Sequence, residues 1–100
     1  MTFLCSSSNN PNEEQLSLSD SLDKYKTLIF VMRADSNTPL ASTVVPKQVF
    51  MQSSRVYVAW YETSNWGASI MVWYVDETHV KVKISERHGW NTINLIAYGM

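Results

Sequence analysis

The side chains in this sequence that could perform acid–base or metal chemistry are few and widely spread. The two histidines, His79 and His88, are nine positions apart, which is not a known spacing for metal ligands. Carboxylates in turns are usually solvated turn formers, and two of them form an acid–base pair only if the fold brings them together. The carboxylates expected in turns are Asp20, Asp23, Asp35, Asp76 and Glu77. The sequence therefore predicts no catalytic residues, no metal ligands and no cofactor.

The remaining reactive or phosphate-binding features are equally sparse. Cys5 is the only cysteine, so it cannot form an internal disulfide, and one cysteine does not make a zinc site. It is either a reactive thiol or a small buried residue, and the second is the commoner role. With three glycines and a net charge of -1, the chain has neither a glycine-rich phosphate loop nor a basic stripe for nucleic acid. We expect a protein that binds or assembles and is not an enzyme.

Tryptophan is the one residue type in surplus. Trp60 and Trp73 fall in predicted strands, where packing in the core is the default role. Trp66 and Trp90 flank predicted loops, and exposed loop tryptophans often stack on sugars or anchor on proteins. The alternative is that these two rings cap the ends of a small core. The candidate ligand-binding residues are Tyr61, Asn65, Trp66, His88 and Trp90.

These residues would be carried by strands. Residues 28–32 are apolar without interruption, which is typical of a central strand covered on both faces. No stretch of ten residues has apolar side chains at helical spacing. The predicted strands are 16–19, 25–32, 42–45, 47–51, 55–61, 68–75, 78–85 and 90–98. Seven to eight short strands separated by turns predict an all-β fold, a small antiparallel β-sandwich.

The start of the chain differs in composition from the rest. Residues 6–14 are polar, low in complexity and contain a proline, so residues 1–14 are predicted to be a flexible lead-in and 15–100 a single domain. The first residues lack the positive charge and apolar core of a signal peptide. No apolar run is long enough to span a bilayer, so no membrane association is expected.

A hairpin is predicted around the two-residue link formed by Asp76 and Glu77. In that register Trp73 faces Val80 on one side of the sheet. The other side of the sheet mixes apolar and basic residues, which suggests a partly solvated face or a subunit interface. The candidate interface residues are Ile70, Val72, Tyr74, Lys81 and Lys83.

Five segments carry a family resemblance: 17–22, 25–30, 42–46, 49–50 and 96–100. Their layout resembles the C-terminal β-domains of tail-fibre and related structural proteins of tailed bacteriophages and prophages. In those domains a Leu-Ser-rich strand precedes a Tyr-Asp-x-Leu-Ile-Phe-Val strand, and Lys26 here replaces the frequent acid.

The resemblance implies a non-catalytic, tail-associated virion component that attaches to a host-surface glycan or protein. It also implies a homo-oligomer, a trimer being the expected form, located in the virion or in the bacterial cytoplasm before assembly. The alternatives are a self-assembling virion assembly or decoration protein, and a small enzyme of unknown type.

Overall fold

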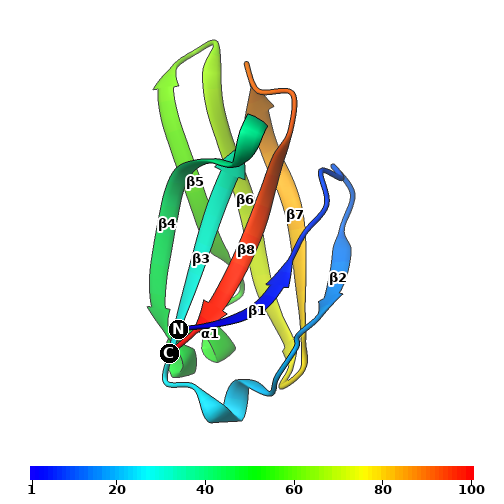
Figure 1. Ribbon diagram of the computed structural model, residues 1–100, viewed down its shortest axis with the longest axis vertical. Helices are drawn as coiled ribbons and strands as arrows, with labels where there is room; N and C mark the ends of the chain where they lie inside the picture. The colour runs from blue at the N-terminus through cyan, green and yellow to red at the C-terminus, as the bar shows by residue number, and fades with distance from the viewer.

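A computed structural model describes all 100 residues and shows two four-stranded antiparallel sheets packed face to face (Figure 1). Sheet A has the strand order β1-β8-β3-β4 and sheet B the order β2-β7-β6-β5. The strands are β1 (Thr2–Ser6), β2 (Glu14–Ser17), β3 (Thr27–Ala34), β4 (Thr38–Pro46), β5 (Val56–Thr63), β6 (Trp66–Asp76), β7 (His79–His88) and β8 (Ile93–Gly99). The predicted all-β sandwich is confirmed.

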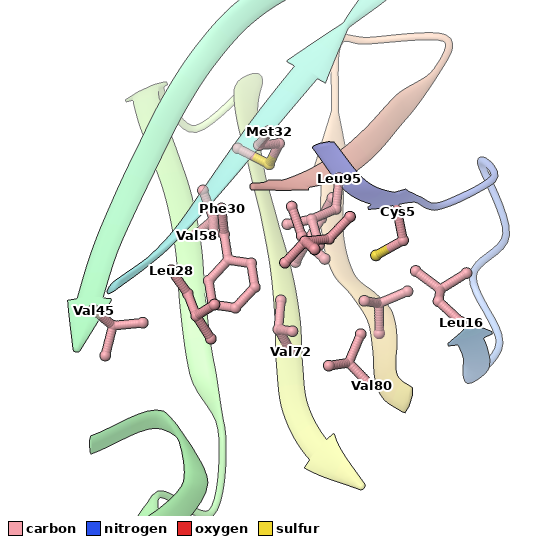
Figure 2. Close-up of a cluster of buried hydrophobic side chains, with 14 of the residues drawn as sticks. Cys5, Leu16, Leu28, Phe30, Met32, Val45, Val58, Val72, Val80 and Leu95 are labelled. Atoms are coloured by element: carbon pink, nitrogen blue, oxygen red, sulfur yellow. The ribbon is translucent and has the colours of Figure 1, made fainter. Parts of the chain in front are cut away.

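One core lies between the two sheets, and every strand contributes to it. In β3 the alternation is strict: Leu28, Phe30 and Met32 are at most 1% exposed, while the residues between them are half-buried. Figure 2 shows Cys5 and Leu16 extending this core towards β1 and β2. The period-2 pattern of side-chain direction therefore builds the sandwich as expected.

The end of the sandwich that carries both chain termini is closed by two short helices (Figure 1). Helix α1 (Lys47–Gln52) follows β4, and the 3-10 helix η1 (Leu22–Lys24) precedes β3. The prediction of a strand at 47–51 is wrong, because Pro46 ends the ladder and the following turn directs Phe50 into the core. The Phe50 ring centre lies 5.3 Å from that of Phe30. None of the helices has the length and apolar character needed to cross a membrane.

Residues 1–14 are not the flexible lead-in that the sequence predicts. Phe3 is opposite Tyr98 in the β1–β8 ladder, and Leu4 and Cys5 are 2% and 5% exposed. The polar tract that follows is a loop between the sheets, and Ser7 fastens it: its backbone N–H donates to Leu95 O and its Oγ accepts from Leu95 N, both at 2.8 Å. β1 is an edge strand of only five residues. Its alternation of apolar and polar side chains is too short to predict a strand from the sequence.

Of the two roles considered for Cys5, a reactive thiol or a small buried residue, the structure shows the second. Burial, and secondarily the charge of Glu14, raises the pKa of the thiol from 9.0 to about 11. Because the thiolate is the nucleophile, we expect Cys5 in the native protein to react with an aromatic disulfide reagent at pH 8 only as the domain opens. Absorbance of the released thiol measures this, with protein in guanidinium as the control. Complete reaction of native protein within the mixing time would contradict the prediction.

The β6–β7 hairpin has a different register from the predicted one. Trp73 is opposite Lys81, Met71 is opposite Lys83, and bulges interrupt the ladder after Ser69 and after Tyr74. The turn is displaced by one residue because the Asp76 carboxylate accepts hydrogen bonds from Thr78 N and His79 Nδ1, each at 2.9 Å. These contacts also hold the pKa of Asp76 below its usual value, the Thr78 bond contributing most.

The bulge after Tyr74 shifts the register of the ladder by one residue, and such a shift reverses the faces on which the side chains of β6 lie relative to β7. Ile70 and Val72 are therefore in the core, 1% and 0% exposed, and Tyr74 points inward against Phe50. Lys81 and Lys83 lie on the outer face of sheet B, paired with Trp73 and Met71. The predicted interface of Ile70, Val72, Tyr74, Lys81 and Lys83 is wrong, because these side chains do not share a face.

Candidate functional site

Three of the four tryptophans gather at the end of the sandwich opposite the termini. They come from β5 (Trp60), from the first residue of β6 (Trp66) and from the β7–β8 loop (Trp90), which meet there in Figure 1. Trp90 is the middle ring: its centre is 4.9 Å from Trp66, edge to face, and 5.8 Å from Trp60. Edge-to-face and tilted contacts of this kind hold aromatic rings in fixed relative orientations.

These rings line a surface groove of about 420 Å³, which we call the tryptophan groove. Its other wall is the beginning of β4. The lining residues are Thr38, Pro39, Leu40, Trp60, Glu62, Trp66 and Trp90. Most of them are apolar, whereas the two other hollows of the surface are lined mainly by polar and charged side chains.

The groove exists because the β5–β6 hairpin extends beyond the strands of sheet A (Figure 1). Inward-facing positions on β5 become progressively less covered towards its end: Val58 is 0% exposed, Trp60 is half-buried and Glu62 is exposed. The same change occurs on β6, where Ala68 is buried and Trp66 is 42% exposed. Large rings at these positions fill part of the space that the opposite sheet does not reach.

The loop that carries Trp90 is fastened to the end of the neighbouring strand β3, where Ala34 pairs with Ile93. The Asp35 carboxylate, in the 3-10 helix η2 (Asp35–Asn37), accepts hydrogen bonds from Asn91 N at 3.1 Å and Thr92 N at 2.7 Å. It also accepts one from Thr92 Oγ1 at 3.0 Å. The two backbone N–H groups are the main cause of the lowered pKa of Asp35, so at neutral pH a carboxylate holds this loop in place.

Gly89 supports Trp66 from the same loop. Its φ of +86° lies in the left-handed region that favours glycine. A Cβ at this position would be only 2.5 Å from Trp66 Cε3. The backbone of the β7–β8 loop therefore packs directly against the indole, and the glycine is what allows that contact.

The lining of the groove combines aromatic faces with a single carboxylate. Aromatic faces carry partial negative charge and attract C–H groups and cations. Glu62 is the only ionisable side chain in the lining, whereas glycoside hydrolysis ordinarily requires a pair of carboxyl groups. No group of three or more His, Cys, Asp or Glu side chains is placed to hold a metal ion.

The structure brings together two of the five predicted ligand-binding residues, Trp66 and Trp90. Tyr61 lies on the outer face of sheet B, where its ring covers Gly67 and is 56% exposed. Asn65 is at the tip of the β5–β6 hairpin and His88 pairs with Glu86 at 3.3 Å. Tyr61, Asn65 and His88 do not line the groove.

Sequence reasoning missed the other groove residues. Trp60 was expected in the core and is indeed half-buried, but it also forms part of the groove wall. Glu62 is two residues beyond Trp60, at the bulge of the β5–β6 ladder, and lines the groove with it. Thr38, Pro39 and Leu40 reach the groove from sheet A, and no local pattern signals that approach.

Comparison of the chain with protein-family models, curated proteins and solved structures found no match.

Proposed function

We propose that this protein is a non-catalytic attachment module that binds a carbohydrate of a host surface in the tryptophan groove. The observation that carries the proposal is Trp66, which is 42% exposed although its ring is held by Trp90 and Gly89. An exposed indole that is fixed in place costs little conformational entropy when a ligand packs on it. Such a ring is a preorganised platform.

The lining suits a sugar ring better than a uniformly apolar ligand. One face of many pyranoses presents C–H groups that pack on aromatic faces, and the rim presents hydroxyl groups. Glu62 and Thr38 supply a carboxylate and a hydroxyl at the groove, which can accept or donate hydrogen bonds to such a rim. The volume of about 420 Å³ lies within the range of roughly 300–1,000 Å³ of small-molecule sites.

Two further observations favour attachment over turnover. Glu62 has no second carboxylate beside it in the groove, so bound sugar would meet no acid–base pair. The resemblance of the sequence to phage tail-fibre domains supports a bacterial surface polysaccharide as the source of the ligand.

The test is titration of the protein with oligosaccharides prepared from bacterial surface polysaccharides, followed by NMR. Each tryptophan gives one indole N–H signal, and Trp73 lies away from the groove on the outer face of sheet B. We expect saturable shifts of the Trp60, Trp66 and Trp90 signals and an unmoved Trp73 signal. Saturable binding of a host-surface protein, with no shift by any glycan, would contradict the proposal.

Trp66→Ala should weaken carbohydrate binding at least about tenfold, since the loss of about 1.4 kcal/mol of contact free energy changes Kd by that factor. Trp73→Ala is the matched control, because it removes the same ring from a surface outside the groove. Calorimetric titration of both variants gives Kd. Equal losses in the two variants would indicate a general effect of tryptophan removal on the fold and not a groove.

A further inference from the structure

The tryptophan groove carries one negative charge that no side chain of its lining neutralises. Glu62 is exposed, and the lining contains no Lys, Arg or His. None of the three ion pairs of the chain includes Glu62. Arg87, which is opposite Ala68 in the β6–β7 ladder, donates instead to Asn9 Oδ1 at 2.6 Å. A ligand in the groove therefore meets a carboxylate that has no cationic partner.

The three indoles add partial negative charge to the same groove. The face of a tryptophan ring attracts a cation that lies within about 6 Å of the ring centre. The centre of Trp90 is 4.9 Å from that of Trp66 and 5.8 Å from that of Trp60, so one cation can lie within this range of more than one ring. The indole N–H of Trp90, the positive end of that ring, is buried. Trp90 thus presents only carbon atoms to the groove.

The opposite wall of the groove strengthens the attraction. Pro39 and Leu40 are apolar, and a wall of low dielectric constant beside charge of one sign focuses the electrostatic field on a ligand. Each of the two other hollows of the surface contains at least two Lys or Arg side chains beside its single acid. Of the three, only the tryptophan groove has an acidic side chain and no basic one.

We infer that the carbohydrate bound in this groove is cationic, with the ammonium group of an amino sugar placed between Glu62 and the indole faces. The inference rests on the proposed function and specifies the class of its ligand. A neutral sugar would leave Glu62 without a charged partner, and an acidic sugar would bring a second carboxylate next to it. A protonated amine donates a charge-assisted hydrogen bond to the carboxylate and is attracted by the rings.

The test compares two trisaccharides that differ only in N-acetylation. At about pH 6 the amines of a glucosamine trimer are protonated, whereas the N-acetylglucosamine trimer is neutral. Calorimetric titration of the wild type should give a Kd at least about tenfold lower for the glucosamine trimer. Glu62→Gln keeps the shape of the side chain and removes its charge. This variant should lose the preference and change little in its affinity for the neutral trimer.

Glu13→Gln is the matched control. Glu13 is also an exposed carboxylate outside every ion pair of the chain, but it lines the hollow beside Trp73. Both variants change the net charge equally and at exposed positions, so both should keep the fold, which circular dichroism checks. Only Glu13→Gln should retain the preference for the glucosamine trimer. Loss of the preference in both variants would overturn the inference, because the charge of the whole protein and not the groove would then select the ligand.

Failure of this inference and failure of the proposed function give different results. Equal affinity of the wild type for the two trimers, or a preference that survives in Glu62→Gln, overturns the inference and leaves carbohydrate binding intact. Binding of neutral bacterial oligosaccharides without binding of the glucosamine trimer does the same. If choline shifts the Trp60, Trp66 and Trp90 signals and no saccharide does, both proposals are overturned and the groove is a cation site for another class of ligand.

Discussion

Removal of residues 1–6 is expected to abolish stable folding of the domain. The deletion takes away β1, uncovers the edge of β8 and removes Leu4 and Cys5 from the core. Truncating a buried leucine alone costs about 2–5 kcal/mol, and domains of this size have about 5–15 kcal/mol in total. The loss of two buried side chains and a whole ladder should consume most of that margin.

Guanidinium unfolding followed by circular dichroism measures this effect, and two point variants separate its causes. Leu4→Ala should lower the free energy of unfolding by about 2–5 kcal/mol. Thr2→Ala, at an exposed position of the same strand, should change it by less than about 0.5 kcal/mol. If the truncated chain unfolds at the wild-type midpoint, β1 does not contribute to stability and residues 1–6 are dispensable.

Gly89→Ala is expected to damage both stability and the tryptophan groove. At a φ of +86° an L-residue is strained, which costs about 1–3 kcal/mol. The new Cβ would also lie 2.5 Å from Trp66 Cε3 and 2.9 Å from Asn65 O. Since the second contact is with backbone, rotation of the Trp66 ring alone cannot relieve it, and the loop must move away from the hairpin.

Gly67→Ala is the control for this variant. A Cβ at Gly67 would also meet an aromatic ring, at 2.6 Å from Tyr61 Cδ1, but Tyr61 is exposed and can rotate towards solvent. We expect carbohydrate affinity to fall at least about tenfold in Gly89→Ala and to change little in Gly67→Ala. Shifts of the Trp66 indole N–H signal in the free protein would locate the damage. Wild-type affinity in Gly89→Ala would show that the loop does not position Trp66.

The local alternation of side chains made much of the fold predictable. In β8, within the strand predicted at 90–98, Ile93, Leu95 and Ala97 point into the core while Ile96 and Tyr98 point outward, which is the alternation of a strand. Such assignments depend only on neighbours along one strand. An element whose place depends on a distant contact leaves no such local pattern, as in β1, whose five residues depend on pairing with β8.

The errors in the hairpin and in α1 have a different origin. At Asp76 a side chain competes with the backbone for the turn N–H, and the resulting bulge reverses the faces of a hairpin whose strands were correctly located. At residues 47–51 a run of three apolar residues resembles a strand, but the helix places Phe50 against Phe30. Tertiary packing overrode local propensity there.

The candidate site was predictable only where local sequence features indicate it. Trp66 and Trp90 stood out because they flank loops, and the structure does bring them together. The opposite wall, formed by Thr38, Pro39 and Leu40, depends on how the two sheets are offset. That offset is a property of the whole sandwich and leaves no trace in a local pattern.

Both chain termini lie beside α1, at the far end of the molecule from the tryptophans (Figure 1). Met1 and Met100 are 77% and 61% exposed, so a tag, a support or a larger particle can be joined there without obstructing the indoles. Any tether at either terminus would point the three rings away from the attachment point. The two termini and the tryptophan groove therefore lie at opposite poles of the domain.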